Sequence, residues 1–176
     1  MYSQDIKTMK KMVAERFSPT TFTNQPVSDE LINDMLDVAR WAPSSYNEQP
    51  WKFLVAHNGD ENFQKIYNAL MEGNQNWAGN APILVVTLAN DNYARNGKPN
   101  RHAWHDTGMA MGFFLLAGVE AGVQVHQMGG FFPEKIERNI ELPEGYHPVA
   151  VAAIGYTQET AEQESRTRKP VREIRL

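Results

Sequence analysis

The stretch of this chain that decides its fold and function is Trp41-Ala-Pro-Ser-Ser-Tyr-Asn-Glu-Gln-Pro-Trp51. It connects a segment with helical spacing of apolar residues to an apolar run of strand length. A plain helix-to-strand connection needs only a glycine or an asparagine. Here two hydroxyl groups and an amide lie between two prolines, each of which fixes one backbone angle. Such a loop can hold donors still for a ligand. A turn whose Ser and Asn side chains bond its own backbone is the open alternative.

The composition is that of one globular domain. The chain has 176 residues, of which 41% are hydrophobic and 22% charged, and a chain of this size buries about 70% of its unfolded surface. The net charge of -4 argues against a nucleic-acid binder that relies on bulk positive charge. The absence of cysteine excludes disulfides, thiolate catalysis and Cys-based metal sites. The uncharged, mostly apolar run at residues 107–119 is too short to span a membrane. The N-terminus has no secretory pattern, so we expect a cytoplasmic protein.

Apolar residues recur at helical or strand spacing along most of the chain. Ser28 is a residue type that caps helix starts, and the run 83–89 is apolar throughout, as in a central strand covered on both faces. Helices and strands mix without a regular βαβ rhythm, which predicts an α+β fold with a small sheet and helices packed on it. We expect helices at residues 3–15, 28–39, 60–72, 104–121 and 133–142, and strands at residues 51–57, 83–89, 123–128 and 149–156.

Three of the predicted helices have informative apolar patterns. The helix at 104–121 is apolar on nearly all sides, so it must be buried in the core or in a subunit interface. The final twenty residues are polar and charged, and their pattern indicates no particular structure. The apolar faces of the first two helices are Ile6, Met9, Met12 and Val13, and Leu31, Met35, Val38 and Ala39.

Three further segments have side chains or backbone suited to a flat, phosphorylated ligand. Arg16-Phe17-Ser18 and Arg166-Thr-Arg168 offer guanidinium groups, whose planar fork suits phosphate oxygens. The pair Gly129-Gly130 lets backbone N–H groups approach a ring closely. Each segment also has an ordinary interpretation: a surface arginine, a turn and a solvated tail.

In chain order, these segments resemble the nitroreductase family of FMN-dependent oxidoreductases. The strongest match is Ala42-Pro-Ser-Ser-Tyr-Asn-Glu-Gln-Pro-Trp51, which is similar to the family signature Ala-Pro-Ser-x-x-Asn-x-Gln-Pro-Trp. In the first motif Phe17 and Thr20 stand where the family has basic residues, so we expect a less cationic phosphate site. Other matching segments are residues 16–22, 80–86, 106–108, 128–131, 151–156 and 166–170.

The resemblance implies one nitroreductase-like FMN-binding domain over residues 1–176, with a central mixed or antiparallel sheet flanked by helices. It also implies a homodimer with FMN at the interface and a C-terminal extension that wraps the partner subunit. The implied reaction passes a hydride from NAD(P)H through flavin N5 to a small acceptor, such as a nitroaromatic or a quinone, with ping-pong kinetics. The choice between NADH and NADPH and the identity of the acceptor stay open.

The resemblance also implies roles for individual residues. The arginines and Ser18 would hold the FMN phosphate and ribityl chain, and the Ser44–Asn47 loop would come from the other subunit. The Gly129–Gly130 backbone would approach flavin N5, and neither a catalytic side chain nor a metal is implied. The implied cofactor-binding residues are Arg16, Phe17, Ser18, Pro43, Ser44, Ser45, Asn47, Gln127, Met128, Gly129, Gly130, Arg166 and Arg168.

Parts of the sequence also suit three other functions. His102 and Asp106 would share a helix face, which suits a metal, but a third ligand is not evident. Ser44 or Ser45 as a hydrolytic nucleophile would need a base, and the chain has no Gly-x-Ser-x-Gly motif. A flavin-binding protein without turnover, acting as a sensor or carrier, remains the alternative because a fold does not guarantee activity.

Overall fold

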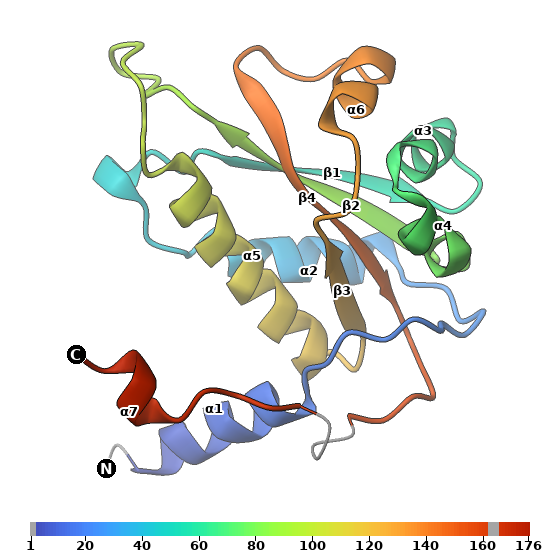
Figure 1. Cartoon of the computed structure of the whole chain (residues 1–176), viewed down its shortest axis with the longest axis vertical. Coiled ribbons are helices and arrows are strands. Elements are labelled where there is room, and N and C mark those ends of the chain that lie inside the picture. Colours follow the sequence, from blue (N-terminus) through green and yellow to red (C-terminus); the bar gives the residue numbers. More distant parts are fainter. Residues whose placement is uncertain (1–2, 162–165) are drawn as a thin grey trace.

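A four-stranded sheet in the order β1-β2-β4-β3 lies at the centre of the computed structural model, which describes residues 3–161 and 166–176 (Figure 1). All three strand pairings are antiparallel. Of the two expected arrangements, mixed and antiparallel, the sheet therefore has the antiparallel one. Strand β2 is interior and buried over all but its last residue, which confirms the predicted central strand. The strands are β1 (Trp51–His57), β2 (Ile83–Asn90), β3 (Gln124–Met128) and β4 (Tyr146–Gly155).

Helices cover both faces of this sheet, which confirms the predicted α+β class. Two of them, α2 (Asp29–Ala39) and α5 (Ala103–Glu120), pack on one face. Three shorter ones, α3 (Glu61–Ala69), α4 (Glu72–Ala78) and α6 (Pro133–Asn139), pack on the other. Within the described residues, none of the helices has the length and apolar character needed to cross a lipid bilayer.

The core under α5 shows where the predicted stripe of the second helix is wrong. Ser28 caps α2 as predicted, because its Oγ accepts the Leu31 N–H at 3.2 Å. However, Ile32 is buried against α5 and the sheet, whereas Val38 is 44% exposed. Met35 and Ala39 of the predicted stripe are buried, and Leu31 is partly buried against the same core. The prediction therefore omitted Ile32 and wrongly included Val38, two positions at the edges of the stripe that apolar spacing alone does not resolve.

The predicted helix at 60–72 is interrupted. It ends at Ala69 because Leu70 is extended and pairs with Phe131 in an isolated β-bridge. The Met71 N–H donates to the Gly130 carbonyl at 2.9 Å, after which the chain turns into α4. This break depends on residues about sixty positions away, so the local apolar spacing cannot predict it.

Strand β4 begins at Tyr146, three residues before the predicted start. The early start places Pro148 inside the strand, a position that proline usually disfavours. In the structure, Leu88 pairs with Pro148 and Thr87 pairs with Ala150, so the register shifts by one residue at this point. A bulge of this kind leaves room for a residue without an N–H group. Strand β3 pairs only with residues 151–155 of β4 and therefore does not constrain Pro148.

The N-terminal helix α1 (Ser3–Glu15) and the C-terminal tail with α7 (Val171–Ile174) lie together at one end of the molecule (Figure 1). Met9 and Val13 on the predicted apolar face of α1 are close to half exposed, and the side chain of Ile6 lies outside the described part. On α7, Val171 and Ile174 are each 70% exposed. The tail therefore runs beside α1 of its own chain and presents apolar side chains outward.

Candidate functional site

The loop between α2 and β1 has an unusual backbone. It contains the 3-10 turn η1 (Ser45–Asn47), and Tyr46, Asn47 and Gln49 have φ angles of 55°, 58° and 50°. In the described chain, these are the non-glycine residues with positive φ. For a tyrosine this conformation is strained, and it persists only where the surroundings impose it. Strain of this kind in a loop is a reason to look for a ligand there.

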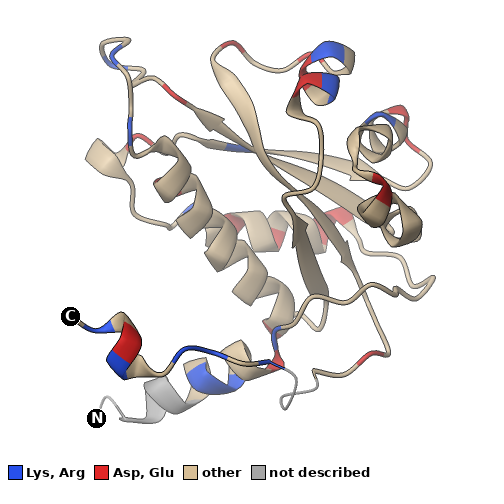
Figure 2. Ribbon diagram, viewed as in Figure 1, with Lys and Arg blue, Asp and Glu red and all other residues tan. Residues whose placement is uncertain are grey.

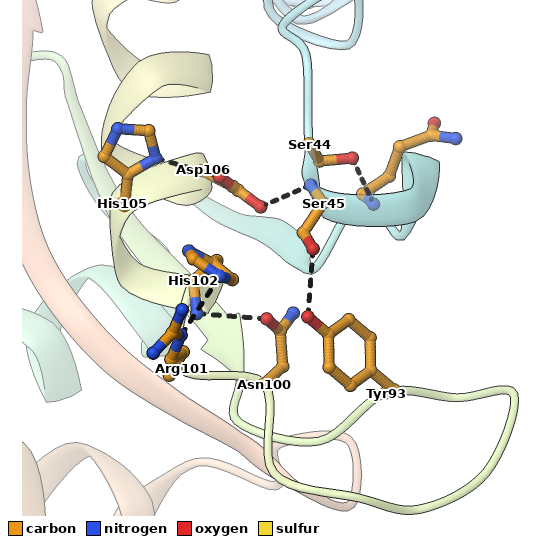
Figure 3. Close-up of polar contacts among 9 residues, drawn as sticks. Ser44, Ser45, Tyr93, Asn100, Arg101, His102, His105 and Asp106 are labelled. Atoms are coloured by element: carbon orange, nitrogen blue, oxygen red, sulfur yellow. Dashed lines mark hydrogen bonds and ion pairs between the residues drawn. The ribbon is translucent and has the colours of Figure 1, made fainter.

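Asp106 of α5 holds this loop in place (Figure 3). Its carboxylate is buried, accepts the Ser45 N–H at 2.8 Å, and lies 2.9 Å from Nδ1 of His105. The Ser45 hydroxyl lies 2.9 Å from the Tyr93 hydroxyl. Ser44 Oγ accepts the Gln49 N–H at 3.0 Å, so both serines act partly as structural residues of the turn.

Asn47 differs from the serines. Its carbonyl accepts a hydrogen bond from Gln49 Nε2 at 3.2 Å, whereas its side-chain amide has no hydrogen-bond partner in the described part of the chain. The residue is exposed. An amide offers both a donor and an acceptor. The loop thus presents one polar side chain outward from a backbone fixed by its neighbours.

The metal and hydrolase alternatives lack support in this geometry. Asp106 points to Ser45 and His105 rather than to His102, and within residues 3–161 and 166–176 no group of three or more metal-ligating side chains converges. The Ser45 hydroxyl contacts the Tyr93 hydroxyl, and no hydrogen bond joins Ser44 or Ser45 to a histidine in the described chain. Asp106 is an anchor for the loop.

A cleft of about 700 Å³ at the other end of the molecule brings the predicted arginines together. Burial lowers the pKa of Arg16, and the positive charges of Arg166 and Arg168 lower it further. Figure 2 shows basic residues on α1 and on the tail that runs beside it, in addition to those on other elements. None of these three arginines forms an ion pair with a described acidic residue. The cleft is lined by Arg16, Phe17, Ser18, Gln158, Glu159, Thr160, Arg166 and Arg168.

The three guanidinium groups are held differently. Arg166 donates from Nη1 to the Ala14 carbonyl at 2.7 Å and from Nη2 to the Val13 carbonyl at 3.2 Å, so it caps the C-terminal end of α1. Its Nε is buried and has no hydrogen-bond partner among residues 3–161 and 166–176. Arg16 donates to Ser18 Oγ at 3.3 Å, and Arg168 donates to the carbonyl of the adjacent Thr167. Clustered cations with unused donors are the donor set of an anion site.

Strand β3 connects this cleft to the glycine pair. At its start, Gln124 accepts the Phe17 N–H at 3.3 Å and donates to the Glu15 carbonyl at 3.2 Å. The strand has five residues, which corresponds to roughly 15 Å at about 3.3 Å per residue. Gln127 is exposed, but the Met128 side chain is 3% exposed and packs in the core, so Met128 can serve a ligand only through its backbone.

The two glycines after β3 have different surroundings. A Cβ added to Gly129 would meet no atom within 4 Å. A Cβ added to Gly130 would lie 2.8 Å from Nδ2 of Asn74, and that Nδ2 donates to the Gly130 carbonyl at 2.9 Å. A side chain at Gly130 would therefore have to displace the Asn74 amide, whereas the backbone of Gly129 is open to close approach, as the sequence predicts for the pair.

One chain does not bring all the predicted residues together. Ser44, Ser45 and Asn47 lie at the N-terminal end of α5, near Asp106, whereas Arg16, Arg166 and Arg168 lie beyond its C-terminal end (Figure 1). Helix α5 has 18 residues, which corresponds to about 27 Å. Pro43 is exposed beside the loop. A ligand that touched both groups of residues would have to lie between two molecules.

Sequence reasoning missed three residues that shape the site. Gln124 and Asn74 fix the first motif and the glycine pair through side-chain hydrogen bonds to backbone. Glu159 accepts hydrogen bonds from the N–H groups of Thr20 and Thr21 and from the Thr21 hydroxyl, and so ties the segment after β4 to the wall of the cleft. Isolated polar residues of this kind have no spacing signal in the sequence.

Comparison with known proteins identifies the family. The model of the Nitroreductase family matches residues 13–76 and 68–156. A crystal structure of an oxidoreductase containing FMN is 34% identical, with a TM-score of 0.78 over 84% of this chain and 76% of that chain. The Nitroreductase Family Protein from Streptococcus pneumoniae has the same fold, with a TM-score of 0.83 at 19% identity over 96% of this chain and 98% of that chain. The FMN reductase [NAD(P)H] of Bacillus subtilis is 22% identical over 173 residues, which cover 89% of this chain and 68% of that protein.

Glu159 makes the wall of the cleft sensitive to pH. The hydrogen bond from the Thr21 side chain is the largest cause that lowers the pKa of Glu159, and the Thr20 and Thr21 N–H groups add to it. A lowered folded-state pKa gives stability that is present above the ordinary pKa of glutamate and is lost as pH falls through the folded-state value. Glu159→Gln should cost about 0.5–1.5 kcal/mol at pH 7, because the bonds are charge-assisted but partly exposed. The difference from the wild type should shrink below about pH 4.

The measurement is urea unfolding across this pH range, with Glu144→Gln, an exposed acid in another loop, as the matched control. A Glu159→Gln protein whose stability differs from the wild type by the same amount at about pH 3 and at pH 7 would contradict the role of the charged form.

Proposed function

Because the chain belongs to the nitroreductase family, we propose that it is an FMN-dependent oxidoreductase whose single domain covers residues 1–176. In this proposal it passes a hydride from NAD(P)H to a small acceptor, such as a nitroaromatic or a quinone. The printed descriptions of two relatives, an oxidoreductase containing FMN and an FMN reductase [NAD(P)H], support the choice of cofactor and co-substrate.

The observation that carries the proposal is the group of Arg16, Arg166 and Arg168. Three mutually repelling cations in a partly buried cleft are unfavourable unless an anion joins them, and the pKa of Arg16 is lowered first by burial and then by the charges of Arg166 and Arg168. A phosphate group brings a charge of about -1.5 to -2 and three acceptor oxygens. The buried, unpartnered Nε of Arg166 is one donor that such an oxygen would satisfy. The donor set therefore fits the phosphate end of FMN, although Phe17 and Thr20 contribute no charge.

Besides binding the phosphate, the chain would position the flavin ring. When bound, FMN supplies a ring that can accept and return a hydride at N5, so the protein needs no nucleophile or metal. β3 leads from the arginine cleft to Gly129, whose open backbone allows a flat ring to lie close. Asn47 offers an unpartnered amide for the polar edge of a ring. The two co-substrates would use the same ring face one after the other.

We propose that the site is completed by a second copy of the chain. Two chains with α5 antiparallel would bring the Ser44–Asn47 loop of one to the arginine cleft of the other, across the separation of about 27 Å. Gly108 and Gly112 of α5 face open space, which permits close approach of another helix. A partner would also cover the exposed Val13 and Val171. In this dimer the C-terminal tail would reach the partner subunit.

Turnover is the direct test of the enzyme. The purified protein should release FMN on denaturation and should oxidise NADH or NADPH in the presence of a quinone or nitroaromatic. Double-reciprocal plots at several acceptor concentrations should be parallel, because the oxidised coenzyme, having given up its hydride, leaves before the acceptor binds. Protein that binds FMN but transfers no electrons to any of these acceptors would instead be the flavin-binding protein without turnover. Intersecting plots would rule out the ping-pong order.

Substitution of Arg168 tests the proposed phosphate site with little effect expected on the fold. Its side chain bonds only the neighbouring Thr167 carbonyl within the described chain, so Arg168→Ala should leave the fold intact. Loss of one charge-assisted contact should weaken FMN binding roughly tenfold to a hundredfold, measured by fluorescence titration of the apoprotein. The matched control is Arg172→Ala in α7, which removes an exposed tail cation outside the cleft. Equal dissociation constants for both variants and the wild type would remove the tail from the site.

A shared site predicts complementation between two defective subunits. Asn47→Gly removes the amide and keeps the positive φ that glycine accepts. In a mixed dimer of Asn47→Gly and Arg168→Ala chains, one site has both changes and the other has neither. Doubly tagged heterodimers should therefore have about half the wild-type activity, well above either homodimer. Heterodimers no more active than the homodimers would show that each site is built within one chain. Light scattering should give about twice the 20.0 kDa chain mass.

A further inference from the structure

Tyr46, Tyr93 and Arg95 form an exposed cluster beside the Ser44–Asn47 loop, here called the aromatic–arginine cluster. The Arg95 guanidinium lies 3.8 Å from the centre of the Tyr46 ring and 5.1 Å from the centre of the Tyr93 ring. The two rings meet edge to face, with their centres 5.9 Å apart. An arginine over aromatic faces is held by cation–π attraction and keeps the N–H groups at its edge free.

The loop that supplies Tyr93 and Arg95 is attached firmly to the rest of the site. Residues Asn92 and Pro99 form a β-bridge, and the Tyr93 N–H donates to the Lys98 carbonyl at 2.8 Å. The Tyr93 hydroxyl contacts Ser45 Oγ, as Figure 3 shows, and the Ala94 N–H donates to Glu48 Oε1. The cluster is therefore a built part of the loop surface.

A purely structural role does not explain the cluster. Tyr46 is 73% exposed and has a φ of 55°, a conformation that a bulky side chain tolerates poorly. Arg95 forms no ion pair with a described acidic residue, and the Glu48 carboxylate beside it is engaged with backbone. An exposed ring in a strained conformation, with an unpaired cation stacked on it, presents both an apolar face and a positive charge.

The position of the cluster relates it to the proposed reaction. Tyr46 lies between Ser45 and Asn47, two residues that the proposed dimer brings to the cofactor of the partner subunit. The Tyr46 ring and the Arg95 guanidinium group would then border the space that the acceptor enters. A carboxylate accepts two parallel hydrogen bonds from a guanidinium, and an aromatic ring packs on a tyrosine face.

We propose that the aromatic–arginine cluster selects flat aromatic acceptors that carry an anionic substituent such as a carboxylate. This inference rests on the proposed function, since it assigns a specificity to the acceptor pocket of that enzyme. Tyr46 provides the stacking face, Tyr93 orients the arginine, and Arg95 supplies the charge that distinguishes an anionic acceptor from a neutral one of the same shape.

The test compares 4-nitrobenzoate with 4-nitrobenzamide, which have nearly the same shape and differ by one charge. With NADH as the electron donor, Arg95→Gln should lower kcat/KM for 4-nitrobenzoate about tenfold and leave the value for the amide within about twofold. Arg95→Lys should retain part of the preference, because it keeps the charge but loses the planar fork. Comparing each variant with the wild type cancels the different reactivity of the two acceptors.

Lys98→Gln is the matched control, since it removes the same charge from the same exposed loop outside the cluster. An equal loss in Lys98→Gln and Arg95→Gln would show general charge attraction and would overturn the proposal. The proposal would also be overturned if Arg95→Gln left the ratio of kcat/KM for 4-nitrobenzoate to kcat/KM for 4-nitrobenzamide unchanged. If that variant changed only the preference for NADPH over NADH, the anion would be the phosphate of the coenzyme, and the proposal would again be wrong. A wild-type protein that binds FMN but reduces neither acceptor nor a quinone would instead count against the proposed function itself.

Discussion

The rest of the molecule depends on helix α5, which is long and mostly apolar. Its core-facing residues, with Phe114 fully buried, hold α2 and one face of the sheet in place. Asp106 in its first turn fixes the Ser44–Asn47 loop at one end, and Gln124, just beyond its other end, fixes the segment after α1. A rigid helix therefore separates the two groups of ligand-facing residues by a distance that one chain does not close. The same separation explains why a second copy is expected to complete the site.

Electrostatic repulsion explains the character of the cleft beyond that helix. Arg166 caps α1 and is thereby committed to the structure, and it places its charge next to Arg16 and Arg168. The helix end stabilises Arg166 because cations are favourable near C-terminal carbonyls. The other two guanidinium groups lack such compensation from acidic residues in the described chain. The fold thus supports the first arginine itself and leaves an anionic ligand to compensate the others.

Local patterns predicted most of the fold, and the errors have a common origin. β1 agrees with its predicted bounds, and the predicted bounds of α5 differ by one residue at each end. The break after Ala69 and the early start of β4 at Tyr146 were missed because both depend on pairing with distant residues, Phe131 and Leu88. For the site, a motif could indicate Arg16 and the Ser44–Asn47 loop. It could not show that Arg166 caps a helix or that Glu159 holds the cleft wall, because both contacts join residues more than 130 positions apart.

The structure separates the parts that hold the proposed cofactor from the parts that meet the acceptor. The arginine cleft and Gly129 belong to a helix end, a strand end and the tail, all tied by hydrogen bonds to the sheet or to α1. Tyr93 and Arg95 instead lie on the loop between β2 and α5, which contacts the site through Ser45, Tyr46 and Glu48. Changes in that loop can alter the surface offered to an acceptor while the cofactor contacts stay as they are. Specificity in this protein is therefore expected to follow the sequence of residues 91–100 more closely than that of the helices and strands.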